Sequence, residues 1–439
     1  MMKTPINSQI VDQKLALCGI DKMEDASIRD VVRVVNMIEE ETGEKFIRME
    51  MGVPGLKPSK LGVEAEKQAL ENGVASAYPM LEGVKLLKQE ASKFVKNFMN
   101  VDIQPEGIVP TVGSMQGGYA AFMAIGNCEA NKDTILFIDP GFPVQKTQLE
   151  VMNQKYESFD VFNYRGNKLK DKLESFLEKG TIAGIIYSNP NNPAWICFNE
   201  EELKIIGGLA TKYDVIVMED LAYFAMDFRS DLSQPGVGPY QPTVANYTDN
   251  YVLMISSSKA FSYAGQRIGL LCVSDALFHK KYKGLQSRFG AHEFGYAIIY
   301  RIIYALSSGT SHSAQYALAA MLKAANEGQF NFVEEVREYG ERAKIMKKLF
   351  FENGFELVYE KDESLPLADG FYFTISYSGM SGPELNKKLL YYGISAICLN
   401  ETGSLKEGLR ACVSQVSREQ FKVLEFRLKE FHNQYKIQN

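Results

Sequence analysis

The chain has 439 residues and a formal net charge of −6; 46% of the residues are hydrophobic and 23% are charged. This composition predicts a globular protein with a sizeable core, in two or three domain-sized units or in one large α/β domain with a smaller lobe. The acidic balance and the lack of a Lys/Arg-rich run argue against nucleic-acid binding, and no apolar run is long enough to span a bilayer.

The start of the chain and its cysteines indicate a cytoplasmic protein. Residues 1–5 lack the apolar stretch of a signal peptide. The 6 cysteines show no CxxC spacing, so we expect free thiols in a reducing compartment. The 4 histidines show no metal-ligand spacing, so we expect no metal site.

The first hundred residues predict helices near 24–42, 59–72 and 84–98. Apolar residues recur at helical spacing over 24–42, and Gly43 provides a stop for that helix. Turn-rich segments at 51–56 and 78–83 separate the helices, and each could line a site or simply join two lobes.

From about residue 109 the pattern alternates between strands and helices. Short apolar runs at 134–139, 182–188, 214–219 and 251–257 are separated by helical stretches near 115–127, 144–154, 168–179 and 199–213. This alternation predicts an α/β fold with a mainly parallel sheet sandwiched by helices. The link from 257 to the next run at 268–273 is too short for a crossover helix, so one antiparallel neighbour is expected.

Beyond about residue 320 the pattern changes to long charged helices and short strands. Helices are predicted near 330–353, 382–391 and 417–436, with strands around 370–375 and 408–413. This part of the chain therefore predicts a smaller α+β lobe.

Chemistry-bearing residues follow the predicted strands, where ligands bind in sheets of this kind. Gly113 and Ser114 open a helix and offer backbone N–H groups to an anion, although they could also be an ordinary N-cap. Phe142 could stack on a ring or belong to the core. Asp220 and Tyr223 place a carboxylate and a phenol after another run, and a buried Asp requires a cationic partner or hydrogen bonds.

Lys259 follows the run at 251–257, between serines and eight residues before Arg267. A lysine partly removed from water near another cation has a lowered pKa, and its amine can attack a carbonyl. The alternative is a loop lysine paired with an acid. Taken together, the strand-end residues describe a pocket for a small molecule with a phosphate, a flat ring with a basic nitrogen, and an aldehyde, as in pyridoxal 5′-phosphate.

With these residues in place, the chain resembles fold-type I pyridoxal-phosphate enzymes, specifically the class I/II aminotransferases, over nearly its whole length. The resemblance is carried by Asn-Pro-Asn-Asn-Pro at 189–193, by Asp-Leu-Ala-Tyr at 220–223, and by Ser-x-Ser-Lys with an arginine eight residues later at 256–267. It implies a large cofactor-binding domain over 56–322, a small domain from 20–55 and 323–439, and an N-terminal arm over 1–19.

The resemblance also implies roles around the cofactor ring. Lys259 would form the Schiff base with the cofactor and then move the substrate's α-proton, while Asp220 would keep the pyridine nitrogen protonated. Tyr223 and Asn192 would hydrogen-bond the 3-oxygen of the ring, and Phe142 would stack on its face.

Further implied roles concern the phosphate, the substrate and a second subunit. Tyr78 resembles the residue that reaches the phosphate of the neighbouring subunit, which implies a homodimer. Arg410 resembles the fork that grips the substrate α-carboxylate, with the Asn192 side chain and the Gly52 backbone as helpers. The phosphate cup would consist of Gly113, Ser114, Met115, Ser256, Ser258 and Arg267.

The chain departs from the family pattern in two places. Many relatives continue Asn-Asn-Pro with Thr-Gly, whereas this chain has Ala194 and Trp195, and the tryptophan could shape the site or belong to the core. The segment 304–311 is neutral, although Arg288 and Arg301 lie nearby in sequence, so the sequence leaves open whether dicarboxylates are accepted.

The leading interpretation is a cytoplasmic, homodimeric aminotransferase that acts on an amino acid and a 2-oxo acid in two steps. The alternative within the same fold is a C–S lyase or an amino-acid decarboxylase. A cofactor-binding transcription regulator would need an added DNA-binding domain for which the chain has no room. The missing GxGxxG pattern argues against a nicotinamide oxidoreductase.

Overall fold

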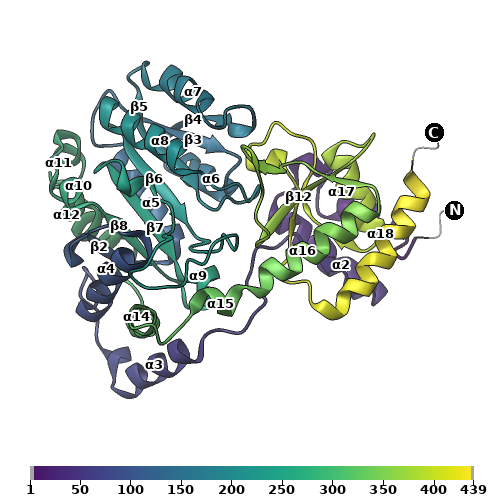
Figure 1. Ribbon diagram of the computed structural model, residues 1–439, viewed down its shortest axis with the longest axis horizontal. Helices are drawn as coiled ribbons and strands as arrows, with labels where there is room; N and C mark the ends of the chain where they lie inside the picture. Colours follow the sequence, from purple (N-terminus) through teal and green to yellow (C-terminus); the bar gives the residue numbers. More distant parts are fainter. Residues whose placement is uncertain (1–3, 437–439) are drawn as a thin grey trace. The chain divides into compact units, whose positions relative to one another are not determined.

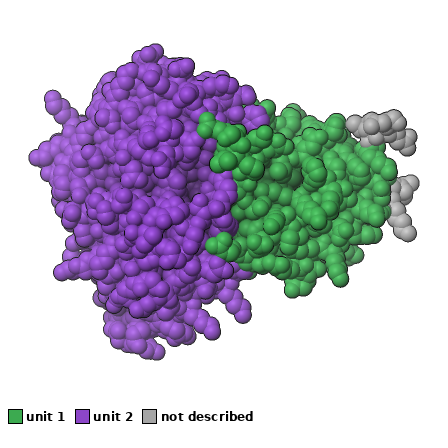
Figure 2. All heavy atoms as spheres, in the orientation of Figure 1, with its two compact units in different colours: residues 1–55, 192–196, 337–439 green, residues 56–191, 197–336 purple. Residues whose placement is uncertain are grey.

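The structure is a computed structural model that describes residues 4–436, and the chain divides into two compact units. Unit 1 takes its described residues from 1–55, 192–196 and 337–439, and unit 2 consists of 56–191 and 197–336 (Figure 2). In the described part of the chain, no helix combines the length and the apolar composition needed to cross a membrane.

Unit 2 is built around a seven-stranded sheet in the order β2-β8-β7-β6-β5-β3-β4 (Figure 1). Strands β3 to β7 pair in parallel, whereas β8 is antiparallel to both β7 and β2. The predicted mainly parallel sheet with an antiparallel neighbour is thus confirmed. The strands are β2 (Ile108–Val112), β3 (Thr134–Asp139), β4 (Lys155–Asp160), β5 (Ile182–Ser188), β6 (Ile216–Leu221), β7 (Tyr251–Ser256) and β8 (Ile268–Val273).

Helices cover the sheet because its central strands are apolar on both faces. Helix α5 packs on β2, β7 and β8, and its Phe122 lies in a core cluster with Met254 and Leu271. The helices of unit 2 are α3 (Lys60–Glu71), α4 (Lys85–Met99), α5 (Gly113–Ile125), α6 (Pro143–Val151), α7 (Lys168–Leu177), α8 (Glu200–Tyr213), α9 (Ser257–Ala260), α10 (Asp275–His279), α11 (Lys283–Phe289), α12 (Phe294–Ala297), α13 (Tyr304–Ser307), α14 (His312–Asn326) and α15 (Phe332–Val336). A π-helical turn, η7 (Ile298–Ile303), joins α12 to α13, and 3₁₀ turns lie at η2 (Val74–Ser76), η3 (Pro105–Gly107), η4 (Val161–Asn163), η5 (Val244–Asn246) and η6 (Ala264–Gln266).

Strand β6 differs from its predicted range in a way that matters for the site. It covers Ile216–Leu221 instead of 214–219, because Asp214 ends helix α8 in a left-handed conformation with φ 48°. Asp220 therefore lies inside the strand and not in the loop after it. The edge strand β4 was not predicted, since its sequence Lys-Tyr-Glu-Ser-Phe-Asp is polar and half-exposed.

Unit 1 is the smaller α+β lobe that the sequence predicts. Its four-stranded antiparallel sheet has the order β14-β15-β12-β9, formed by β9 (Phe355–Leu357), β12 (Tyr372–Tyr377), β14 (Ile397–Cys398) and β15 (Leu409–Cys412). Segments from the first and last parts of the sequence meet where β1 (Ile47–Arg48) pairs in parallel with β13 (Ile394–Ser395). A short hairpin of β10 (Lys361–Asp362) and β11 (Leu365–Pro366) also belongs to this unit. Its helices are α1 (Ser8–Leu17), α2 (Ile28–Thr42), α16 (Glu338–Glu352), α17 (Gly382–Tyr391) and α18 (Phe421–Tyr435), with 3₁₀ turns η1 (Met23–Asp25), η8 (Asn400–Thr402) and η9 (Arg418–Gln420).

Candidate active site

The carboxyl ends of β6 and β7 bring Asp220 and Lys259 into electrostatic contact. The two strands are parallel neighbours, with Asp220 opposite Met254, so their carboxyl ends lie at the same edge of the sheet. Lys259 follows β7 directly, on the one-turn helix α9, and its side chain is half-buried. The positive charge of Lys259 is one of the influences on the Asp220 carboxylate.

Asp220 is a buried carboxylate whose ionised form is only partly compensated. Gln145 Nε2 donates to its Oδ2 at 2.9 Å, and the backbone N–H of Ala222 donates to its Oδ1 at 3.1 Å. Burial raises the pKa of Asp220 to about 6, against the opposing effects of these hydrogen bonds and of Lys259. A cationic group placed beside this carboxylate would restore its ionised form.

The start of α5 and the residue before β8 form a tight backbone cradle. Gly113 has φ +65°, and a Cβ at this position would lie 2.5 Å from Arg267 Nη2. A Cβ at Gly269 would lie 2.9 Å from the backbone nitrogen of Ser114. Glycine is needed at position 113 because the Arg267 guanidinium lies so close, and at position 269 because the backbone of Ser114 does. Backbone N–H groups at the start of α5 and the Arg267 guanidinium are therefore neighbours, a combination that suits an anion.

The other residues predicted for the cofactor lie near these strand ends in sequence. Ser256, the last residue of β7, accepts a hydrogen bond from Ser258 N through its Oγ at 3.1 Å. Met115 lies in the first turn of α5, and its carbonyl accepts from Gln148 Nε2 at 2.8 Å. Phe142 is half-buried at the N-cap of α6.

Two tyrosines predicted for the site have opposite exposures. Tyr223 is 4% exposed, in the turn after β6. Tyr78 is 90% exposed, in the loop after η2. An aromatic side chain this exposed is available to a partner molecule.

In unit 1, Arg410 is a buried guanidinium with incomplete hydrogen bonding. It is 1% exposed, and its Nη1 donates to Asn192 Oδ1 at 3.4 Å while its Nη2 donates to the backbone oxygen of Glu50. Its Nε is buried and has no hydrogen-bond partner among residues 4–436. The structure thus brings Arg410 and Asn192 together within this unit. A carboxylate is the ligand that best matches a guanidinium fork.

Gly52 and Tyr372 form one wall of the Arg410 cluster. A Cβ at Gly52 would lie 2.0 Å from Tyr372 Oη, so only glycine allows the phenol to approach. The Arg410 guanidinium lies over the Tyr372 ring, with 4.8 Å between Cζ and the ring centroid. Tyr372 was not predicted as a site residue, because an aromatic residue on a short strand resembles ordinary core.

The structure also contains a second buried carboxylate, Glu219, which the sequence did not single out. It accepts hydrogen bonds from Tyr187 Oη (3.1 Å), Asn189 Nδ2 (3.4 Å), Thr243 Oγ1 (2.5 Å) and Val244 N (3.2 Å). Burial nevertheless raises the pKa of Glu219 to about 7. Neighbouring residues of a strand point to opposite faces, so Glu219 and Asp220 face different sides of the sheet.

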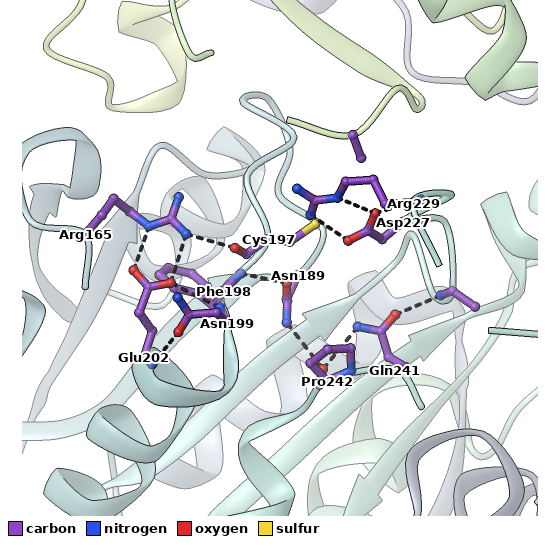
Figure 3. A network of polar contacts seen from close by, with 12 residues as sticks. Arg165, Asn189, Cys197, Phe198, Asn199, Glu202, Asp227, Arg229, Gln241 and Pro242 are labelled. Carbon is purple, nitrogen blue, oxygen red and sulfur yellow. Dashed lines mark hydrogen bonds and ion pairs between the residues drawn. The ribbon is translucent and has the colours of Figure 1, made fainter. Parts of the chain in front are cut away.

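A polar network fixes the chain in unit 2 on both sides of residues 192–196 (Figure 3). Before this segment, Asn189 accepts a hydrogen bond from Phe198 N at 3.2 Å. After it, Arg165 donates to the carbonyl of Cys197 at 2.8 Å and pairs with the buried Glu202 at 2.7 Å. The rigid prolines of the 189–193 motif and this network together hold the direction of the turn.

The polar and charged groups at the strand ends of unit 2 fit pyridoxal 5′-phosphate, the cofactor expected from the sequence. An amine on Lys259 matches the aldehyde, and the buried Asp220 with its raised pKa matches a protonated ring nitrogen. The cradle in which Arg267 crowds the Cα of Gly113 matches the phosphate. The match rests on the chemistry of the residues present.

Comparisons with known proteins identify the family to which the chain is similar. A family model described as "Aminotransferase class I and II" matches residues 44–427. The chain is 25% identical over 348 residues to a "Probable aspartate aminotransferase" of Methanocaldococcus jannaschii, which covers 78% of this chain and 82% of that protein. It is also 25% identical over 354 residues to an aspartate aminotransferase of Pyrococcus horikoshii, covering 79% of this chain and 80% of the relative.

A solved structure shares the fold at lower identity. The alanine aminotransferase from Pyrococcus furiosus superposes with a TM-score of 0.76 at 19% sequence identity, over 95% of this chain and 99% of that chain. This likeness confirms the predicted fold, a helix-covered, mainly parallel sheet with a smaller lobe.

Proposed function

Because the chain belongs to the aminotransferase class I and II family and is an aminotransferase, we propose that its unit 2 binds pyridoxal 5′-phosphate as the cofactor of the reaction. The enzyme then moves an amino group from an amino acid to a 2-oxo acid in two half-reactions. The observation that carries the proposal is the coupling of Lys259 to the buried Asp220 at the ends of adjacent parallel strands. The relatives named above are all aminotransferases, so they give no support to the lyase or decarboxylase alternative.

The proposed chemistry divides between the cofactor and the chain. When bound, pyridoxal phosphate supplies an aldehyde that takes up the amino group and a ring that accepts electrons. Lys259 Nζ would hold the cofactor covalently, and its free amine would move the proton at the substrate α-carbon. Asp220 keeps a proton on the ring nitrogen by its negative charge. Within unit 2, Tyr223 Oη would hydrogen-bond the 3-oxygen of the ring, and Phe142 would pack on the ring face.

The cradle around α5 binds the phosphate in this proposal. The start of α5 contributes backbone N–H groups, and Arg267 contributes a fork-shaped cation. Its close approach to Gly113 supports this role, since no other residue than glycine leaves room for it. The residues proposed for the phosphate are Gly113, Ser114, Met115, Ser256, Ser258 and Arg267.

We assign the substrate carboxylate to Arg410, assisted by the Asn192 side chain and the Gly52 backbone. A guanidinium that is 1% exposed, with a buried Nε lacking a partner in the described chain, supports a ligand of opposite charge. Tyr78 is proposed to reach the phosphate of a second subunit in a cytoplasmic homodimer, which its 90% exposure in one chain supports. The large and small domains are proposed at 56–322 and at 20–55 with 323–439, with 1–19 as an arm.

Covalent trapping tests the cofactor assignment. Protein incubated with pyridoxal phosphate and reduced with borohydride is expected to carry the cofactor on the peptide that contains Lys259, as read by mass spectrometry. The K259A variant should show neither the label nor turnover, and K259R, which keeps the positive charge, should behave like K259A. Labelling of another lysine in place of Lys259 in the wild type, or turnover in K259A, would overturn the assignment.

A donor screen tests the reaction class. Each common amino acid is added to the loaded enzyme, and amino-group transfer to a 2-oxo acid is followed with isotope-labelled donors. Transfer requires both substrates, whereas release of pyruvate and ammonia without an oxo acid would indicate the lyase alternative.

A further inference from the structure

Trp195 is a fully buried tryptophan in an unusual backbone conformation. It is 0% exposed and has φ 62°, within the left-handed region that bulky side chains rarely adopt. Such a conformation persists only where the surrounding structure determines it. The surroundings of Trp195 within unit 1 therefore indicate what holds it there.

The indole of Trp195 occupies the space that a side chain at position 370 would need. A Cβ at Gly370 would lie 2.0–2.2 Å from the indole atoms Cε2, Cζ2 and Nε1. The ring also meets Tyr372 edge-on, with 6.2 Å between centroids and 66° between planes. The glycine thus admits the indole, and the indole packs against the phenol two residues further along the chain.

Tyr372 in turn lies beneath the Arg410 guanidinium. Strands β12 and β15 pair with Thr374 opposite Arg410, so Tyr372 is a diagonal neighbour of Arg410 on the same face of the sheet. Arg410 Cζ lies 4.8 Å from the Tyr372 ring centroid, within the range of a cation–π interaction. The ring of Tyr372 therefore supports one face of the guanidinium.

Trp195 also lies close in sequence to a hydrogen-bond partner of Arg410. Asn192, three residues earlier in the same segment of unit 1, accepts from Arg410 Nη1 at 3.4 Å. The indole of this segment packs against Gly370. One side chain thus contacts the aromatic platform of Arg410 and lies on the segment that carries its acceptor.

We propose that Trp195 is a positioning residue that orients the Arg410 guanidinium for the substrate carboxylate, through the Tyr372 ring and the Asn192 amide. The proposal rests on the carboxylate-binding role proposed above for Arg410. It assigns to Trp195 and Gly370 a paired role, in which the glycine makes room for the tryptophan.

The first experiment compares a carboxylate with its neutral amide. The amino acid found in the donor screen and its neutral amide are used as donors, and kcat/KM is measured for each with the wild type and with W195G, W195L and W195F. We expect W195G and W195L to lower the ratio of kcat/KM for the acid to that for the amide about tenfold, mainly through KM for the acid, because a misaligned hydrogen bond between two charged groups loses about that factor. W195F keeps an aromatic edge toward Tyr372 and should retain most of the ratio. Equal losses of kcat/KM for both donors would mean that Trp195 is merely structural and would overturn the proposal. If W195G does not fold, the comparison of W195L with W195F gives the same test.

The second experiment measures unfolding of the cofactor-free protein and needs no turnover. G370A in the wild type forces a methyl group into the indole and should lower the unfolding midpoint by about 1–3 °C. In the W195G background the methyl group meets no indole, so G370A should cost little or nothing. An equal cost in both backgrounds would overturn the proposed pairing.

R410Q, which removes the positive charge, separates failure of this inference from failure of the proposed function. If R410Q leaves the acid-to-amide ratio unchanged, the carboxylate role of Arg410 is wrong. If R410Q abolishes the preference for the acid while W195G and W195L preserve it, only the positioning role of Trp195 is wrong. The double variant W195G/R410Q should lose no more of the preference than R410Q alone, because both changes act on one guanidinium.

Discussion

Replacing Asp220 by asparagine is expected to stabilise the cofactor-free protein at neutral pH while abolishing turnover. Burial raises the pKa of Asp220 from 3.8 to about 6, so the folded protein binds this proton more tightly than the unfolded chain does. The stability from this group is fully present below pH 3.8 and is lost as the pH rises through 6. At pH 7.5 the folded protein therefore contains a poorly compensated carboxylate.

The size of this effect follows from the raised pKa. One pKa unit corresponds to about 1.4 kcal/mol, so a rise of about two units costs the folded protein about 3 kcal/mol above pH 6. The asparagine in D220N carries no charge and still accepts from the Ala222 N–H that now bonds Oδ1. D220N should therefore exceed the wild type by about 2–3 kcal/mol in free energy of unfolding at pH 7.5 and match it near pH 4.

The assay is urea unfolding of the cofactor-free protein between pH 4 and pH 8, followed by circular dichroism. E219Q is the matched control, since Glu219 is the adjacent buried acid and its pKa is raised from 4.5 to about 7. The stability that Glu219 contributes should be lost between pH 4.5 and pH 7 in the wild type, and this loss should be absent in E219Q. Saturating pyridoxal phosphate should stabilise the wild type more than D220N, because only the carboxylate gains a cationic partner. Parallel pH curves for wild type and D220N, or normal turnover in D220N, would refute this reasoning.

Two further predictions test a ligand contact and a surface ion pair. In equilibrium titration, R267A should weaken binding of pyridoxal phosphate about 10- to 100-fold, since an arginine–phosphate hydrogen bond contributes roughly 1.5–3 kcal/mol. Binding of phosphate-free pyridoxal should be unchanged. Equal weakening of both ligands would place Arg267 outside the phosphate site. Glu338 lies between Arg418 and Arg342, and hydrogen bonding to Arg418 above all lowers its pKa to about 2. The stability from these ion pairs of Glu338 is present above pH 4.5 and is lost as the pH falls through 2. In acid unfolding, E338Q should therefore destabilise the protein by up to about 1 kcal/mol at pH 7 and by nothing near pH 2. A destabilisation that persists at pH 2 would contradict the ion-pair origin.

The parallel sheet and its strand-end residues could be predicted because both have local sequence signals. Continuous apolar runs mark buried parallel strands, and a ligand site lies where such strands end. The predicted range of β6 was two residues too early, because helix α8 ends in a left-handed turn at Asp214. A left-handed helix end usually has glycine, so an aspartate there gives no clear signal in the sequence. The polar edge strand β4 was missed for the opposite reason, because its exposed position requires no apolar run.

Residues that support the site from a distance in sequence could not be predicted. Gln145 bonds Asp220 at 2.9 Å although 75 residues separate them, and its only signal was a polar residue in the first turn of the helix after Phe142. Tyr372 and Gly370 acquire their importance from Trp195, far away along the chain. Pairings of this kind depend on the fold, so a single sequence does not contain them.

Asp220 in unit 2 and Arg410 in unit 1 are buried charged groups whose charge is not fully compensated by the surrounding residues. Glu219 receives hydrogen bonds from several different residues, as expected of a structural acid, whereas Asp220 receives fewer and has the cation of Lys259 nearby. Arg410 is as deeply buried as the core, yet its Nε lacks a partner in the part of the chain that the structure describes. Burying a charge without full compensation raises the free energy of the ligand-free protein. In the proposed function, a protonated cofactor ring would supply the cation for Asp220, and a carboxylate substrate would supply the anion for Arg410.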